Sequence, residues 1–363
     1  MKILLITLEY PPFKGGVANY YGFLAKYWPQ EQGATLDVIS NNKGRLCSGN
    51  SLIPWFKTVR LLRKKKKEKA FSYLLVGHIL PLGTAAYLAT WFNPFKYGVI
   101  LHGLDFTAAI KTRRKRIITR LILKKADKII CANSQLAYLV TEFAKNLKTK
   151  ISIQNPGIEA VEIPPLTPAK RADLRLYYQL KKNDIILFSL GRLVRRKGFD
   201  KVIEALARQE LKNIKYLIAG SGEDEAYLRA LVKQNHLENK VIFLGAIDDN
   251  DKWQLLQFSD IFIMPAREIE NDFEGFGIVY LEANLAGKPV IAGISGGVRD
   301  AVIHNETGLL VNPENVGAIE KAIMTLAQDQ ELRLRLGEQG RKRALNNFSW
   351  EKKAQEFKDL INN

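Results

Sequence analysis

The sequence predicts an α/β protein built from two doubly wound domains, each with a parallel sheet between helices. Short apolar runs rich in Ile, Leu and Val alternate with longer amphipathic segments along the whole chain, which is typical of parallel strands joined by crossover helices. The 363 residues exceed the size of one ordinary domain. A cluster of prolines between positions 156 and 168 marks a linker near the middle.

Each predicted strand is an apolar run that ends in a polar or glycine-rich turn. In the N-terminal domain the strands are expected over 2–8, 35–40, 73–77, 97–101, 127–132 and 150–154. In the C-terminal domain they are expected over 184–190, 215–219, 241–244, 261–264 and 289–292. Helices are expected from about 18, over 84–92, 111–125 and about 277–286, and after 134.

The domains follow from this order of elements. Residues 1–160 form the N-terminal domain, 161–175 the linker, 176–345 the C-terminal domain, and 346–363 a terminal helix. That helix is amphipathic, with Trp350 and Phe357 on its apolar face, and we expect it to pack back on the N-terminal domain.

The composition narrows the class of protein. Two cysteines and four scattered histidines have no metal-ligand or disulfide spacing, so we expect a reducing cytosol and no metal site. No apolar run approaches the roughly 20 residues that span a bilayer, which predicts a soluble or peripheral protein.

The excess of positive charge, +18 in total, belongs to the first half of the chain: residues 1–160 hold 26 Lys and Arg against 8 Asp and Glu. This asymmetry predicts a polyanionic partner, an anionic membrane or a nucleic acid.

Two basic segments of the first half also carry apolar side chains, as helices at a membrane surface do. The alternative is two ordinary helices with solvated cations. The residues expected to face a membrane are Trp55, Phe56, Arg63, Lys64, Lys65, Lys66, Lys67, Arg113, Arg114, Lys115 and Arg116.

Residues 260–294 combine a strand, an acidic glycine-containing loop, a helix and a second strand. Free backbone N–H groups of Phe276, Gly277 and Ile278 at the helix start can hold an anion, and Glu274 and Glu282 flank them. A phosphorylated polyol needs such an arrangement, although an ordinary strand–helix–strand unit with a solvated acidic loop stays open. A glycosidase pair is less consistent, because eight helical residues span about 12 Å, more than hydrolysis uses.

A second anion-binding element is predicted after the strand at 184–190. Arg192 and Lys197 lie in a loop bracketed by glycines, where two cations can neutralise a diphosphate. A solvated basic loop is the alternative. In the N-terminal domain Gly15 and Gly16 open the first helix, where backbone can approach a phosphate, although a plain tight turn fits equally well.

Other motifs are weaker. Gly220-Ser-Gly222 lacks the third glycine of a dinucleotide fingerprint, and Asp249-Asn-Asp251 fits helix capping better than metal binding. His102, followed by Asp105, ends a strand at a ligand-facing edge, and a structural histidine is an equal alternative there.

Together these residues resemble the family 4 glycosyltransferases, retaining enzymes of the GT-B fold, in which two Rossmann-like domains face a central cleft. The similarity runs nearly end to end. Its motifs are Gly15-Gly16, His102-Gly-x-Asp105, Asn155-Pro-Gly157, Gly191-Arg192 with Lys197-Gly198, Glu274-Gly-Phe-Gly-x4-Glu282, Ser295-Gly-Gly297 and Phe348-Ser-Trp350.

The resemblance implies a nucleotide sugar in the C-terminal domain, an acceptor in the N-terminal domain, and no metal or other cofactor. Arg192 and Lys197 would stabilise the leaving diphosphate, Glu282 would hold the ribose, and Glu274 would contact the hexose. The implied neighbours are the backbone of Gly15, Gly16, Phe276, Gly277 and Ile278 at the phosphates, Gly245 and Ile247 at the base, His102 at the reacting bond, and Asp105 and Arg267 near sugar or acceptor.

The loop around Glu274 resembles that of GDP-mannose-dependent mannosyltransferases, so we expect mannose transfer to a lipid-linked glycan or glycolipid at the cytosolic face of the plasma membrane. A UDP-dependent glucosyl-, galactosyl- or N-acetylglucosaminyltransferase stays open. An epimerase or hydrolase of the same fold is a further rival. A nucleic-acid-binding protein is remote, because the sequence contains no recognisable nucleic-acid-binding module.

Overall fold

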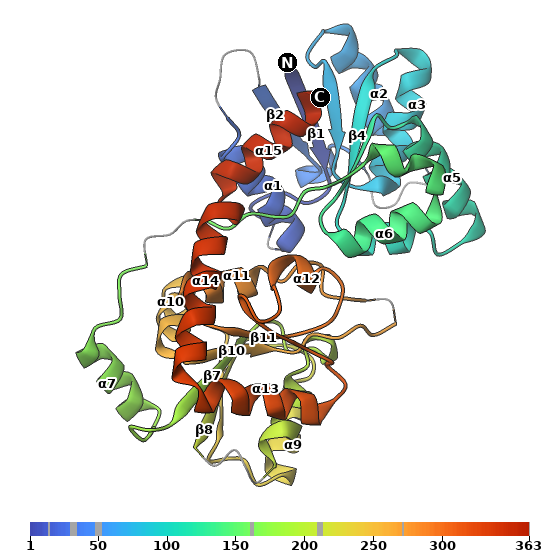
Figure 1. Ribbon diagram of the computed structural model, residues 1–363. Coiled ribbons are helices and arrows are strands. Elements are labelled where there is room, and N and C mark those ends of the chain that lie inside the picture. Colours follow the sequence, from blue (N-terminus) through green and yellow to red (C-terminus); the bar gives the residue numbers. More distant parts are fainter. Residues whose placement is uncertain are drawn as a thin grey trace. The chain divides into compact units, whose positions relative to one another are not determined.

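A computed structural model describes residues 1–13, 15–29, 35–47, 53–159, 163–208, 213–270 and 272–362 (Figure 1). The chain divides into two compact units. Unit 1 comprises Met1–Gly157 with Ser349–Asn363, and unit 2 comprises Ile158–Phe348. Each unit contains a six-stranded sheet in which all neighbouring strands are parallel, as the predicted fold class requires.

The sheet of unit 1 has the strand order β2-β1-β3-β4-β5-β6. The direction in which the sheet grows reverses between β1 and β3, so the loops that follow these two strands are neighbours at a topological switch point. The strands are β1 (Lys2–Thr7), β2 (Thr35–Ser40), β3 (Tyr73–Val76), β4 (Lys96–Leu101), β5 (Lys128–Cys131) and β6 (Ile151–Ile153).

Helices cover both faces of this sheet because alternate strand residues point to opposite sides. Ile3 and Leu5 pack with α1 and the terminal helix α15, whereas Leu4 and Ile6 pack with α2, α3 and α5. Figure 1 shows these helices around the sheet. The helices of unit 1 are α1 (Gly16–Lys26), α2 (Phe56–Lys67), α3 (Thr84–Phe92), α4 (Leu104–Ala109), α5 (Arg113–Lys125), α6 (Ser134–Phe143) and α15 (Trp350–Asn362), with short turns at Asn42–Gly44, Ile79–Gly83 and Lys145–Lys150.

The sheet of unit 2 has the order β12-β11-β10-β7-β8-β9 and reverses between β7 and β10. Its strands are β7 (Ile185–Leu190), β8 (Ile214–Ala219), β9 (Val241–Gly245), β10 (Ile261–Met264), β11 (Val290–Gly293) and β12 (Gly308–Val311). The edge strand β12 was not predicted. It forms by pairing with β11.

Two helical layers enclose the sheet of unit 2, and each has its own apolar core. One core contains side chains of α8, α9 and α13, and the other contains side chains of α10 and α11. The helices are α7 (Pro168–Tyr177), α8 (Phe199–Leu206), α9 (Glu225–Gln234), α10 (Asp249–Phe258), α11 (Ile278–Leu285), α12 (Val298–Ala301), α13 (Val316–Gln328) and α14 (Gln330–Phe348), with a short turn at Arg195–Lys197.

Residues 161–175 were expected to form a linker, but the second half of this range belongs to a helix, α7. Pro168 opens helix α7, where a proline is tolerated because the first N–H of a helix has no acceptor. Arg171 of α7 donates to the carbonyl oxygens of Gln257 at 2.7 Å and Phe258 at 2.9 Å, which attaches this helix to unit 2. Residues 160–162 lie outside the described part of the chain.

Candidate active site

The loops that follow β7 and β10 meet at the switch point of unit 2, and they bring three charged side chains together. Glu274 Oε2 accepts hydrogen bonds from Lys197 Nζ at 2.6 Å and from Arg196 Nη1 at 2.7 Å. Burial opposes the ionisation of Glu274, but Lys197 and Arg196 outweigh it and lower the pKa of the carboxyl group below its ordinary value. The site therefore holds two cations around one buried carboxylate.

In the structure Arg196, and not the predicted Arg192, lies at Glu274, while the expected contact of Arg192 with a diphosphate stays a prediction. Arg196 joins Lys197 at Glu274, and its Nε lies 3.2 Å from Asp272 Oδ2. Arg192 is exposed, and its side chain has no hydrogen bond or ion pair with the described residues. The sequence placed Arg196 in the same loop without assigning it a role, because spacing alone does not tell which side chain of a short helical turn faces the neighbouring loop.

Helix α11 begins at Ile278, four residues beyond Glu274. Gly277 adopts φ +80°, a left-handed conformation that side-chain-bearing residues adopt at a cost, and it precedes the first helical residue. Phe276 is buried and packs against Phe348, with ring centroids 5.7 Å apart. The first N–H groups of α11, beginning at Ile278, have no acceptor within the helix, so they are available to an anion.

Glu282 lies on α11 and is held by a residue that sequence reasoning missed. Its Oε1 accepts from Lys252 Nζ at 2.9 Å, and Lys252 also lies 3.0 Å from Asp249 Oδ1. Burial lowers the pKa of Lys252, but Glu282 and Asp249 raise it by a larger amount, so the net shift of the pKa is upward. The spacing of Asp249 and Lys252, three apart on a helix, was the one available signal.

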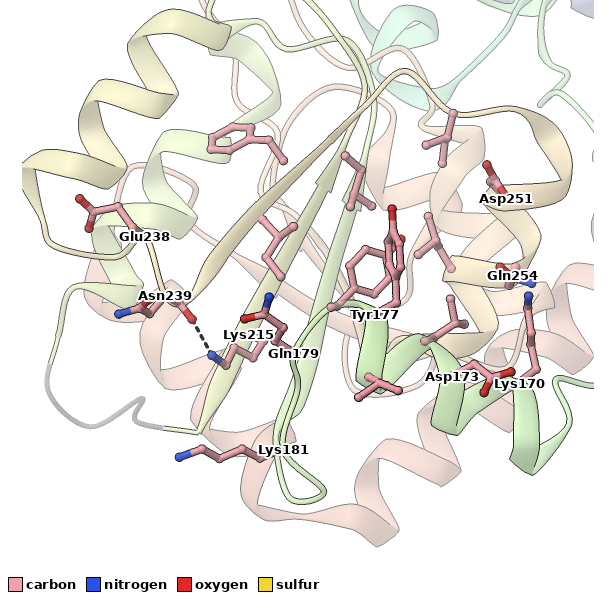
Figure 2. A pocket seen from close by; sticks show the side chains of 18 of the residues that line it. Lys170, Asp173, Tyr177, Gln179, Lys181, Lys215, Glu238, Asn239, Asp251 and Gln254 are labelled. Atoms are coloured by element: carbon pink, nitrogen blue, oxygen red, sulfur yellow. Dashed lines mark hydrogen bonds between the residues drawn. The ribbon is translucent and has the colours of Figure 1, made fainter.

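The end of β9 carries the residues expected near a nucleotide base. Gly245 accepts a hydrogen bond from the N–H of Gly220 at 2.7 Å, which links the ends of β8 and β9. Ile247 lines a groove of about 1320 Å³. Its other lining residues come largely from α7, β9 and α10, and Figure 2 shows Tyr177 and Gln254 among them. Of the predicted donor-binding residues, Ile247 is the one that lines this groove.

The acidic motif at the start of α10 serves as a helix cap. Asp248 Oδ1 accepts from the N–H of Asp251 at 2.8 Å, and Asp249 pairs with Lys252. Within the described ranges, no group of three or more His, Cys, Asp or Glu side chains is arranged to hold a metal ion.

Arg267 has a different environment from the one expected near a sugar. Its side chain is buried, and Nη2 donates to Asp200 Oδ2 at 2.8 Å. Its backbone N–H donates to the carbonyl oxygen of Arg196 at 2.8 Å. Arg267 therefore joins the loops after β7 and β10 and helix α8, and in this way it supports the position of Arg196.

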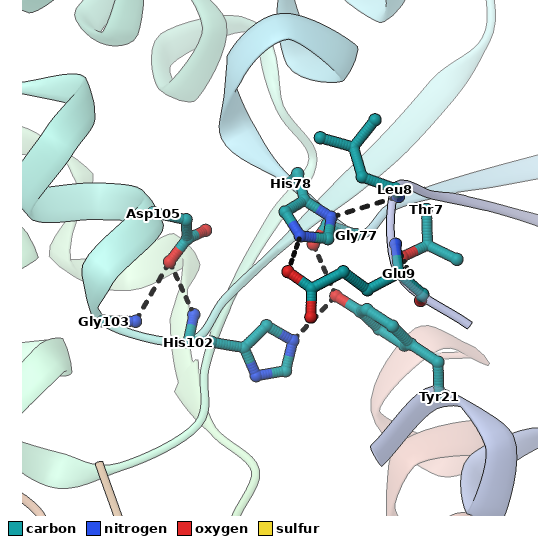
Figure 3. Close-up of polar contacts among 9 residues, drawn as sticks. All are labelled: Thr7, Leu8, Glu9, Tyr21, Gly77, His78, His102, Gly103 and Asp105. Atoms are coloured by element: carbon teal, nitrogen blue, oxygen red, sulfur yellow. Dashed lines mark hydrogen bonds and ion pairs between the residues drawn. The ribbon is translucent and has the colours of Figure 1, made fainter. Parts of the chain in front are cut away.

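In unit 1, His102 lies at the carboxyl end of β4 and contacts α1 (Figure 3). Tyr21 donates its hydroxyl proton to the carbonyl oxygen of Gly77 at 2.6 Å, and the same hydroxyl lies 2.8 Å from His102 Nε2. Because the hydroxyl proton is already used, Nε2 carries the hydrogen and Nδ1 keeps a free lone pair. Burial, followed by the nearby His78, lowers the pKa of His102 to about 3, so the ring is neutral at physiological pH.

Asp105 fixes the loop that carries His102. Its Oδ1 accepts from the N–H groups of His102 and Gly103, both at 3.0 Å. Burial raises the pKa of Asp105, and these backbone hydrogen bonds partly offset that shift. The predicted pair of His102 and Asp105 is thus one structural unit in which the aspartate orients the backbone of the histidine.

The predicted glycine turn lies at the start of α1. Gly15 precedes the helix and Gly16 is its first residue, and an added Cβ at Gly16 would meet nothing within 4 Å. Glu9 lies beside this turn and contacts His78, whose Nε2 is 3.6 Å from Glu9 Oε1 (Figure 3). Sequence reasoning missed both residues, because they follow separate strands and only the sheet order brings them together.

The residues expected at a membrane lie on one face of unit 1, where α3 lies beside both α2 and α5. Most are exposed, but Trp55 is half-buried and packs against the core, which differs from the expectation. Helix α3 adds Trp91, which is 68% exposed, and Phe92, whose ring lies 4.1 Å from the Arg63 guanidinium. We call this surface the basic face; its exposed members are Phe56, Arg60, Arg63, Lys64, Lys67, Trp91, Phe92, Arg113, Arg114, Lys115, Arg116, Ile117, Arg120 and Leu121.

Comparison with known proteins identifies relatives over the whole length. A family model described as "Glycosyl transferases group 1" matches residues 171–343. The "GDP-mannose-dependent alpha-(1-6)-phosphatidylinositol monomannoside mannosyltransferase" of Mycobacterium tuberculosis is 28% identical, over 99% of this chain and 98% of its own. Sucrose-phosphate synthase from Thermosynechococcus elongatus superimposes with a TM-score of 0.77 at 23% identity, covering 99% and 98% of the two chains. HepE of Anabaena in complex with UDP superimposes with a TM-score of 0.80 at 19% identity over the full length of both chains.

Proposed function

The chain belongs to the group 1 glycosyltransferases and has the GT-B fold, and from this premise we propose that it transfers mannose from GDP-mannose to a lipid-linked acceptor with retention of configuration. The observation that carries the proposal is the pair of cations, Arg196 and Lys197, around Glu274 at the switch point of unit 2. Full-length similarity to a GDP-mannose-dependent enzyme supports the choice of donor.

The donor binds through its diphosphate and ribose. The diphosphate is neutralised by Lys197, Arg196 and the N–H groups at the start of α11. These groups stabilise the leaving diphosphate most strongly when it carries its full negative charge. Glu282, oriented by Lys252, accepts hydrogen bonds from the ribose hydroxyls. Gly245 and Ile247 flank the base.

No metal ion is required in this proposal. Cationic side chains and helix N–H groups supply the charge stabilisation that a divalent cation provides elsewhere. Arg192, which is exposed, is available to the outer phosphate.

Transfer then uses the sugar-facing groups. Glu274 stabilises positive charge that develops at the anomeric carbon, and the leaving phosphate takes the proton of the acceptor hydroxyl that attacks from the same face. His102, neutral and with Nδ1 unprotonated, accepts a hydrogen bond from a hydroxyl group of the hexose.

The acceptor is delivered from a membrane surface. Within the described ranges no helix is long and apolar enough to span a bilayer. The basic face combines exposed aromatic side chains with Lys and Arg, which favours peripheral binding to the anionic cytoplasmic face of the plasma membrane. A lipid-linked glycan or glycolipid at that surface would be the substrate.

A UDP-hexose remains the second candidate for the donor, because HepE, whose fold this chain shares, was solved with UDP. The deciding experiment compares the thermal unfolding midpoint with GDP-mannose, UDP-glucose, UDP-galactose and UDP-N-acetylglucosamine, since a ligand of the native state raises that midpoint. We expect GDP-mannose alone to raise it and mannose transfer to persist in EDTA. Stabilisation by UDP sugars alone would overturn the choice of donor, and loss of transfer in EDTA would overturn metal independence.

The membrane proposal is tested by cosedimentation with phosphatidylglycerol vesicles. We expect binding that weakens with salt and falls in Trp91→Ala, and little binding to phosphatidylcholine. The control Tyr138→Ala changes another exposed aromatic residue of unit 1, on α6, and should bind as the wild type does. Equal binding of all three proteins would contradict the assigned surface.

A further inference from the structure

Unit 1 has a topological switch point of its own, and the resemblance that implies an acceptor in this domain does not say which residues at that point recognise it. The strand order reverses between β1 and β3. In open α/β sheets, ligands bind outside the carboxyl ends of the strands at such a point. The residues that follow these two strands are Glu9 and His78, and Figure 3 shows their side chains turned toward each other.

The contact between Glu9 and His78 has a defined orientation. His78 Nδ1 accepts the N–H of Leu8 at 3.4 Å, so the proton of the neutral ring is on Nε2, which faces Glu9 Oε1 at 3.6 Å. The His78 side chain is 10% exposed, and that of Glu9 is 35% exposed. The imidazole thus lies beside one carboxylate oxygen at the edge of the sheet, while the glutamate remains accessible.

The second oxygen of Glu9 is free to bind a ligand. Among the described residues no side-chain or backbone group donates a hydrogen bond to Glu9 Oε2. An added Cβ at Gly15 would lie 3.7 Å from this oxygen, and an added Cβ at Gly16 would meet nothing within 4 Å. The glycine turn therefore leaves room for a ligand beside the carboxylate.

Neighbouring groups in the same unit determine which chemistry fits. The Glu9 carboxylate lies close to the Tyr21–His102 pair (Figure 3), and its charge helps to raise the pKa of Tyr21, after burial, Asp105 and Tyr20. Asp105 Oδ2 is buried without a hydrogen-bond partner. Carboxylate oxygens only accept hydrogen bonds, and they repel phosphate, so this cluster suits hydroxyl groups and not an anion.

We infer that Glu9, held by His78, binds a hydroxyl group of the acceptor, whose headgroup is a sugar or cyclic polyol. This rests on the proposed transferase function and adds the part of the acceptor that is recognised and the residues that recognise it. Glu9 contacts the acceptor, and His78 positions Glu9.

The test compares Glu9→Gln with wild type in two assays. Saturation-transfer NMR with octyl α-mannoside, in the presence of GDP, measures acceptor binding without catalysis. Steady-state kinetics with GDP-mannose and either octyl α-mannoside or phosphatidylinositol monomannoside in micelles measures transfer. We expect Glu9→Gln to raise KM for the acceptor about tenfold or more, as loss of a hydrogen bond to a charged group does. The KM for GDP-mannose and its slow hydrolysis without acceptor should stay within about twofold of wild type.

Two further variants keep the test decisive. Glu68→Gln removes another glutamate of unit 1 that pairs with Lys64 and Lys65 at the surface, and it should behave as wild type. His78→Gln should raise KM for the acceptor less than Glu9→Gln does, with an unchanged unfolding midpoint.

An unchanged acceptor KM in Glu9→Gln, or an equal rise in donor KM, overturns the inference. Wild-type protein that binds neither acceptor probe also overturns it. Wild-type protein that binds the acceptor probe but transfers no mannose contradicts the proposed function instead.

Discussion

At the scale of single residues, the site of unit 2 is organised around one buried carboxylate. Glu274 is 8% exposed and neutralises Lys197 and Arg196. A carboxylate in this position keeps two cations close together that would otherwise repel each other. A diphosphate can take over the same neutralisation when the donor binds.

This arrangement predicts that Glu274→Gln separates binding from transfer. Two cations left without their partner should lower the free energy of unfolding by about 3 kcal/mol or more. Added GDP should raise the unfolding midpoint more than in the wild type, because the diphosphate replaces the missing charge, while transfer should be lost. Thermal unfolding with and without GDP measures both. The control Glu204→Gln breaks the Lys201–Glu204 pair of α8 and should cost under about 1 kcal/mol. Unimpaired transfer in Glu274→Gln would contradict the assigned role.

A second prediction concerns His102 and pH. Its pKa in the folded state is about 3, against an ordinary value of 6.5, so the unfolded chain binds more protons between these values. The stabilisation is fully present above pH 6.5 and is lost progressively as the pH falls toward 3. Urea unfolding, followed by Trp fluorescence, should therefore show a midpoint urea concentration that decreases as the pH is lowered below 6.5. In His102→Gln, which keeps His78, Glu9, Asp105 and the two tyrosines, the fall should be shallower, and identical slopes would count against a buried neutral ring.

At the scale of elements, the start of α11 depends on Gly277. An added Cβ would lie 2.3 Å from the Tyr280 ring, and that ring is fixed because its hydroxyl donates to the carbonyl oxygen of Met264 at 2.7 Å. The helix therefore begins at a position where the backbone is left-handed and the space beside it is filled. This combination sets where the N–H groups of α11 point.

We expect Gly277→Ala to lower the free energy of unfolding by about 3 kcal/mol or more, from backbone strain and overpacking together, and to weaken nucleotide binding. Gly287 is the matched control, since its φ is +74° and an added Cβ would meet nothing within 4 Å. Gly287→Ala should cost about 1–2 kcal/mol from strain alone and leave nucleotide affinity unchanged. Denaturant unfolding and GDP titration distinguish the two, and equal effects of both variants would show that the Tyr280 contact is unimportant.

At the scale of the whole molecule, unit 1 is assembled from two distant parts of the chain. The terminal helix α15 belongs to it, and Trp350 lies 1% exposed among the rings of Tyr20 and Phe23 at centroid distances of 5.4 and 5.7 Å. Gln154 also donates to the carbonyl oxygen of Lys353 at 3.0 Å. Tyr20 in turn packs edge-on against His102 at 5.0 Å, so α15 supports the helix that holds the histidine.

Trp350→Ala should therefore destabilise unit 1 by about 3–5 kcal/mol, because it leaves a large cavity against α1. Trp91→Ala removes the same side chain from an exposed position and should change stability by no more than about 0.5 kcal/mol. Hydrogen exchange of the β1 and β3 amides reports on unit 1 separately from unit 2. Equal protection of these amides in the two variants would refute the role of α15.

The sequence by itself determined the class of fold. Apolar runs predict strands and helical spacing predicts helices, and both patterns are formed by residues close together in the chain. The sequence identified eleven of the strands, the anion-binding start of α11, and the motifs through which the chain resembles its family. Lys197 and Glu274 were also predicted, since each follows an apolar strand in a loop with distinctive glycines. These features are carried by residues close together in the chain.

Tertiary structure decided which distant side chains meet. The order of strands brings the loops after β7 and β10 together, so Arg196 and not Arg192 faces Glu274, and the fold of α10 against α11 places Lys252 at Glu282. The reversal of order between β1 and β3 likewise joins Glu9 to His78, 69 positions apart in the chain. Charge pairing across such separations depends on sheet topology and side-chain direction, and neither leaves a periodic signal in the sequence.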